Sequence, residues 1–157
     1  MIGTGLMSDS YMPIESQLLY VRKVLEWIEK YGFGFSVIIK SKFILRDLNL
    51  LEKMNKNTKC IIQMILITFC DDLCRIIESN VATTKERLKV LMRFREKNIE
   101  VFLGIVIILG VPMRMKRKYF YQKCEENGIV HNNDTIFTSI RKFESNQMQV
   151  SFWDKNK

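Results

Sequence analysis

The chain has 157 residues, of which 47% are hydrophobic and 27% charged, a composition typical of a globular protein with one core. Its 25 Lys and Arg residues against 17 Asp and Glu residues give a net charge of +8, which favours polyanionic partners such as nucleic acid. The four cysteines (60, 70, 74 and 124) lack the spacing of a disulfide-dense secreted module, which excludes that class.

No targeting or membrane-spanning segment is visible in the sequence. Residues 1–12 carry Asp9 and no basic residue, so the positive region of a secretory signal is missing. The longest uncharged apolar stretch, residues 101–113, is shorter than the roughly 20 residues that cross a bilayer. We therefore expect a soluble intracellular protein with free thiols and no membrane span.

The first part of the chain predicts a flexible leader followed by a helix. Residues 1–12 show little periodicity, so we assign them as the leader and residues 13–157 as a single helical domain. Pro13 is a favoured residue in a first helical turn, and apolar residues then recur at spacings of three and four through about Lys30. Gly32 and Gly34 end this predicted helix.

Residues 33–45 contain many β-forming residues, split by polar residues 40–42. This pattern is compatible with a short hairpin or with a strand leading into a loop. Residues 48–54 predict a short helix.

Two apolar segments predict helices at the centre of the fold. Residues 61–73, preceded by possible capping residues at 57–58, are apolar on most sides of a helix. Residues 99–111 are apolar nearly all round, and Pro112 ends that segment. Either residues 61–69 or residues 101–111 could form the central helix.

The remaining segments predict amphipathic helices and one strand. Thr84 is a candidate cap for a basic helix that continues through Arg93. Residues 115–126 and 134–142 predict two further helices, and the alternation over 147–153 predicts a strand. The expected fold is mainly α: a single-domain helical bundle around an apolar central helix, with one or two short peripheral strands.

Catalytic and metal sites are not indicated. Cys70, Cys74, Cys124 and His131 could supply four ligands, but their spacing differs from the paired spacing of structural zinc sites. No Ser or Cys stands in a recognisable nucleophile setting, and no phosphate-binding glycine loop is present. We therefore expect no metal, no cofactor and no enzymatic activity.

Basic residues give the main indication of function in the sequence. They cluster in two segments, where each side chain could neutralise a phosphate of duplex DNA or instead belong to a solvated face. The candidate nucleic-acid-binding residues are Lys85, Arg87, Lys89, Arg93, Arg95, Lys97, Arg114, Lys116, Arg117 and Lys118.

The order of features from residue 66 onward resembles the N-terminal part of the piggyBac-type transposase domain. Its elements are an acidic helix that leads to Asn80, the apolar residues 99–111 with two glycines, the aromatic cluster 119–121, the segment 141–144 and the segment 152–156. The resemblance covers about residues 66–157.

This resemblance implies a mostly helical region for dimerisation and DNA binding. The family's catalytic aspartates lie further along the transposase, so Asp134 and Asp154 are not expected to be catalytic. The implied function is that of a non-catalytic transposase-derived fragment that binds DNA and associates with itself. If it binds DNA, we expect it to be nuclear. The alternative is a small helical protein–protein interaction module, such as a viral Bcl-2-like immune modulator with a helical partner.

Overall fold

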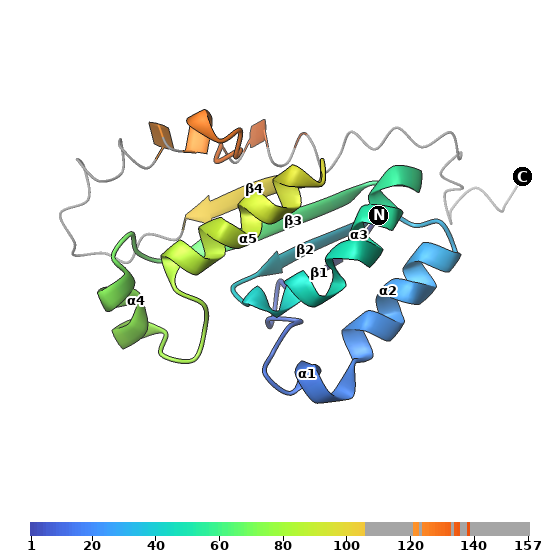
Figure 1. Cartoon of the computed structure of the whole chain (residues 1–157), viewed down its shortest axis with the longest axis horizontal. Coiled ribbons are helices and arrows are strands. Elements are labelled where there is room, and N and C mark those ends of the chain that lie inside the picture. Colours follow the sequence, from blue (N-terminus) through green and yellow to red (C-terminus); the bar gives the residue numbers. More distant parts are fainter. Residues whose placement is uncertain (106–120, 123, 133, 136–137, 139–157) are drawn as a thin grey trace, which may run out of the picture.

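The computed structural model describes residues 1–105, 121–122, 124–132, 134–135 and 138, and within them it is a mixed α/β fold (Figure 1). Its centre is a four-stranded parallel sheet in which the strands follow one another in chain order. The strands are β1 (Ile2–Thr4), β2 (Phe35–Ile39), β3 (Cys60–Leu66) and β4 (Glu100–Ile105).

Helices form a layer over one face of this sheet. Figure 1 shows α3 and α5 lying across that face, with α2 on the outer side of α3. Sequential parallel strands require crossovers of one hand, which place the connecting helices on the same face. The helices are α1 (Glu15–Leu18), α2 (Tyr20–Lys30), the 3₁₀ helix η1 (Lys42–Asp47), α3 (Leu48–Asn57), α4 (Asp71–Ile77) and α5 (Thr84–Glu96).

The core lies between the sheet and the helices. Ile62 of β3 pairs with Val37 on one side and Val101 on the other, and all three side chains are at most 2% exposed. On the opposite face, Ile61 and Phe102 form a smaller buried cluster. Both faces of the central strands are therefore apolar.

This burial explains why the predicted mainly-α bundle is wrong. Residues 61–73 and 99–111 were both predicted to be helices, yet the structure shows β3 up to Leu66, with only residues 71–73 helical as the start of α4, and β4 from Glu100. Residues 106–111 lie outside the described part of the chain. A strand buried on both faces is a continuous apolar run without two-residue alternation. Such a run cannot be told from a buried helix by periodicity alone.

The predicted flexible leader also takes part in the fold. Residues 1–12 contain β1, and the Tyr11 side chain is fully buried. Gly5 follows β1 with φ 93°, where a Cβ atom would lie 1.9 Å from the Ile38 carbonyl oxygen. Only glycine fits this close approach between the first loop and β2.

Other local predictions had mixed outcomes. Residues 33–45 form β2 followed by η1, the strand-into-loop alternative, and the helix predicted at 48–54 is confirmed by α3. The single helix predicted from Pro13 is instead two helices, because Leu19 adopts a left-handed φ of 54°.

Only parts of the predicted C-terminal elements fall within the described residues. Residues 121–122 and 124–126 are helical, and Gly128, with φ 64°, follows them. Val130 then forms a parallel bridge with Phe102 of β4. The predicted strand 147–153 and most of the predicted helix 134–142 lie outside the described residues.

Candidate ligand-binding site

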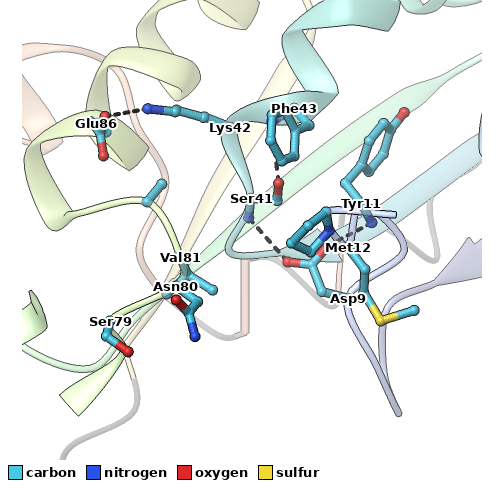
Figure 2. A pocket seen from close by; sticks show the side chains of 12 residues that line it. Asp9, Tyr11, Met12, Ser41, Lys42, Phe43, Ser79, Asn80, Val81 and Glu86 are labelled. Carbon is cyan, nitrogen blue, oxygen red and sulfur yellow. Dashed lines mark hydrogen bonds and ion pairs between the residues drawn. The ribbon is translucent and has the colours of Figure 1, made fainter. Parts of the chain in front are cut away.

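A cavity of about 320 Å³ lies beyond the carboxyl ends of β1 and β2 (Figure 2). Three segments line it: the loop after β1, the start of η1 after β2, and the segment that leads into α5. Its lining residues are Asp9, Tyr11, Met12, Pro13, Ser41, Lys42, Phe43, Ser79, Asn80, Val81, Ala82 and Glu86. The loops that follow parallel strands converge at this edge of the sheet, which brings residues from separate segments together around the cavity.

Asp9 holds two sides of the cavity together. One carboxylate oxygen accepts a hydrogen bond from the Tyr11 backbone N–H at 2.8 Å. The other accepts from the N–H groups of Lys40 (2.8 Å) and Ser41 (3.1 Å) just after β2. Asp9 therefore fixes the loop after β1 to the end of β2, and its oxygens are occupied by backbone donors.

A solvent-accessible ion pair lies at the cavity. The Lys42 ammonium donates to the Glu86 carboxylate at 2.6 Å, and the two side chains are 54% and 39% exposed. The hydrogen bond from Lys42, together with the Thr83 N–H, holds the pKa of Glu86 below its usual value. Lys42 is therefore a cation with donor capacity left after it has bound Glu86.

The same carboxylate also positions the wall formed by α5. The Glu86 side chain accepts from the Thr83 backbone N–H at 2.9 Å, while the Thr83 hydroxyl accepts from the Glu86 N–H at 3.3 Å. This reciprocal pair is a capping box, which satisfies two free donors at the start of the helix. The predicted cap, Thr84, instead donates its hydroxyl to the Thr68 carbonyl at 2.7 Å.

The remaining walls are mostly apolar. Met12 and Phe43 stand on one side in Figure 2, and Val81 stands on the other beside the polar side chains of Ser79 and Asn80. Volumes of about 300 Å³ and above, with apolar walls and a few polar groups, are typical of small-molecule sites.

Arg87 fixes the wall at residues 79–82. Its guanidinium is fully buried and donates to the Ala82 carbonyl (2.7 Å), the Ile65 carbonyl (2.6 Å) and the Glu78 carboxylate (2.7 Å). Glu78 also pairs with Lys40, at the end of β2. Burial by itself would raise the pKa of Glu78, but the hydrogen bonds from Lys40 and Arg87 outweigh it and lower that pKa.

A second buried network supports the opposite wall. Asp47 is fully buried, accepts from the Tyr11 hydroxyl at 3.1 Å, and forms ion pairs with Arg22 (2.8 Å) and Arg46 (2.7 Å). Burial and the Asp47 carboxylate raise the pKa of Tyr11, so its phenol stays neutral and donates. Tyr11 is therefore a supporting residue, tied beneath the cavity.

The predicted nucleic-acid-binding residues are only partly gathered on one surface. Lys85, Lys89 and Arg95 are exposed on α5, whereas Arg87 is buried and cannot reach a phosphate in this conformation. Two further candidates form ion pairs: Arg93 binds Glu96 at 3.2 Å and Lys97 binds Glu52 at 3.0 Å. Arg114, Lys116, Arg117 and Lys118 lie outside the described residues.

The four possible zinc ligands do not converge. Among the described residues, no group of three or more His, Cys, Asp or Glu side chains is arranged to hold a metal ion. All four cysteines are free, and burial raises the pKa of Cys60 to about 12 and that of Cys124 to about 11. His131 stacks on Tyr121 at 4.3 Å between ring centroids.

Comparison with known proteins adds no relative: no family model, curated protein or solved structure matches this chain. Within the described residues, no helix has both the length and the apolar character needed to cross a membrane.

The sequence prediction missed the whole cavity. Asp9 was placed in a leader, Lys42 in the polar break of the β-forming segment 33–45, and Glu86 in the predicted basic helix. The signal that could have found them is the β-branched run in 60–66: as a parallel strand, it would have brought the segments after β1 and β2 to one edge.

Proposed function

We propose that this protein binds a small amphipathic anion in the cavity at the carboxyl ends of β1 and β2. The observation that carries the proposal is the Lys42 ammonium. It lines a mostly apolar cavity and forms an ion pair with the accessible Glu86 carboxylate. An aromatic or aliphatic body would pack against Met12, Phe43 and Val81. A carboxylate or phosphate on that body would displace Glu86 from Lys42.

Phenyl phosphate and benzoate are suitable probes, with benzyl alcohol as the uncharged comparison. Ligand-observed NMR should show that the anions bind at least tenfold more tightly than the alcohol, because a hydrogen bond to a charged group contributes about 1.5–3 kcal/mol. Lys42→Met should remove this preference. Lys53→Met is the matched control, because Lys53 is an exposed lysine paired with Glu29 on another surface.

Glu86→Gln sharpens the test, since it frees the Lys42 ammonium and keeps the capping box, which accepts either Glu or Gln. Anion affinity should therefore rise in this variant, while loss of the exposed Lys42–Glu86 ion pair should cost at most about 1 kcal/mol of stability. Unchanged anion affinity in Lys42→Met, with the fold intact by circular dichroism, would reject the proposal.

A second candidate is contact with nucleic-acid phosphates through α5, favoured by the exposed Lys85, Lys89 and Arg95. Three phosphate contacts predict that log Kd for duplex DNA changes with log salt with a slope of about 3. Binding that ignores salt would reject it. Kinship with piggyBac-type transposases and self-association remain proposals of the same kind. The DNA binding that this kinship implies should weaken in the double variant Lys85→Glu with Lys89→Glu.

A further inference from the structure

An exposed aromatic stripe runs along the outer face of α2. Tyr20, Val24, Trp27 and Tyr31 follow one another at spacings of four, three and four residues, which places them on one side of the helix. Their exposed fractions are 59%, 55%, 70% and 64%. Leu25 and Ile28 lie about 100° around α2 from the stripe and are buried in the core, so the exposed stripe borders the buried face of the helix.

Aliphatic side chains extend the stripe at the start of α2. Ile14, Leu18 and Leu19, in and around α1, are between 37% and 55% exposed. Patches of this kind on a folded protein mark sites of interaction with another protein or a membrane. The stripe and its extension include none of the residues that line the cavity.

Two lysines border the stripe and carry its charge. Lys23 lies over the Tyr20 ring at 5.5 Å and Lys30 over the Tyr31 ring at 5.8 Å. Among the described residues, neither lysine forms an ion pair with a carboxylate. The acids of α2 are already paired, Glu26 with Arg22 and Glu29 with Lys53, so the uncompensated charge along the stripe is positive.

This charge argues against a second copy of the chain as the occupant. An antiparallel pair of α2 helices about a two-fold axis would place Lys23 of one copy beside Lys30 of the other. Like charges facing each other oppose such pairing, and each copy carries a net charge of +8. An anionic surface has the complementary charge.

The side chains also distinguish between anionic partners. Single-stranded nucleic acid binds aromatic rings by stacking, and an aliphatic side chain offers no ring face for a base. A nucleic acid would therefore form no stacking contact with Val24, Leu18 or Leu19, whereas a bilayer can bury all three side chains at the boundary between headgroups and acyl chains. Trp and Tyr are enriched at that boundary, with Lys extending toward the headgroups.

We infer that the α2 face of this protein binds the surface of an anionic phospholipid bilayer. The helix would lie in the plane of the interface, with Trp27 and its neighbours inserted and with Lys23 and Lys30 at the phosphates. Each lysine should increase partition to an anionic surface about fivefold.

The test uses Trp27 as its own reporter. The chain has two tryptophans, so Trp153→Phe leaves Trp27 as the single tryptophan, which is excited selectively at wavelengths where tyrosine does not absorb. Vesicles of 30% phosphatidylserine in phosphatidylcholine should shift its emission to the blue and sediment the protein, while pure phosphatidylcholine should do neither. Lys23→Glu with Lys30→Glu should reduce the sedimented fraction at least tenfold.

A matched control distinguishes binding through this face from non-specific hydrophobic binding. Trp27→Ser should abolish sedimentation of the full chain, whereas Ile76→Ser, which removes a 79% exposed side chain on α4, should leave it unchanged. Equal loss in both variants would overturn the inference. So would a blue shift of Trp27 that depends on protein concentration without vesicles, or one produced by single-stranded oligonucleotide and not by vesicles.

Discussion

Arg87 shows how one side chain can serve the fold when sequence assigns it to a partner. Its position in a basic segment predicted a phosphate contact, yet it donates to two carbonyls and to Glu78 at the boundary between β3 and α5. Charge counting cannot separate an exposed arginine from a buried one. The difference is burial, and here the partners of the buried group include Ile65, which is 22 residues away in the chain.

Arg87→Met should destabilise the protein by about 3–5 kcal/mol, because it removes the arginine hydrogen bonds of two carbonyls and one of the two cations that pair with Glu78. Urea denaturation followed by circular dichroism measures this. Arg93→Met is the control: Arg93 is 67% exposed and pairs with Glu96, and the change should stay within about 0.5 kcal/mol. A similar, small loss in both variants would contradict the role given to Arg87.

The four thiols should differ in reactivity. Burial raises the pKa of Cys60 to about 12 and that of Cys124 to about 11, so both remain protonated at about pH 8, and thiolate is the reactive form. Cys70 is only partly buried. Timed alkylation of the native protein, read by peptide mass spectrometry, should modify Cys70 first; early modification of Cys60 would show that β3 is open.

Among the elements, α5 connects stability with the cavity. Its capping box joins Thr83 and Glu86, and Glu86 is also the carboxylate that binds Lys42. The start of this helix therefore shapes one wall of the proposed site. Loss of the capping hydrogen bonds should therefore lower both the affinity for a ligand and the stability of the fold.

Thr83→Ala should cost about 1 kcal/mol of stability, the usual value for loss of a helix N-cap. The same variant should weaken anion binding, because Glu86 and the segment 79–82 lose their fixed position. Urea denaturation and ligand-observed NMR measure the two effects. Thr135→Ala, a change at an exposed threonine outside α5, should alter neither quantity, and a stable Thr83→Ala protein with normal affinity would refute the link.

Across the whole molecule, ion pairs connect segments that are distant in sequence. Glu78 joins the end of β2 to α5, Glu86 joins η1 to α5, and Glu52 joins α3 to Lys97. Hydrogen bonds from Lys97 and Lys42 lower the pKa of Glu52 and Glu86, and in Glu78 the bonds from Lys40 and Arg87 outweigh burial. The folded state consequently holds these protons less tightly than the unfolded chain does.

Stability should therefore decrease in acid. A carboxyl whose folded pKa is below its ordinary value of 4.5 stabilises the fold fully above that value, and this contribution is lost as the pH falls through the folded pKa. The urea midpoint should be nearly constant between about pH 7 and pH 5 and should fall toward pH 3. Glu78→Gln should flatten part of that fall, and a wild-type midpoint constant down to pH 3 would contradict the assignment.

Local patterns were sufficient for the amphipathic helices. The helical spacing of Leu25 and Ile28 and the short apolar run at 48–54 correspond to α2 and α3. One of the two alternatives for residues 33–45, a strand leading into a loop, corresponds to β2. Each of these segments has one buried face and one solvent-exposed face. The period of their apolar residues therefore indicates whether the segment is a helix or a strand. The composition, likewise, predicted one apolar core.

Tertiary structure alone decided the fold class and the candidate site. β3 and β4 carry buried apolar side chains on both faces of the sheet, Ile62 and Val101 on one and Ile61 and Phe102 on the other. This burial removes the alternation that would identify a strand. Their pairing then sets which loops meet at the carboxyl edge, and so brings Asp9, Lys42 and Glu86 together from three segments. Sequence determines the polarity of each segment, whereas the parallel pairing of distant strands determines which polar groups become neighbours.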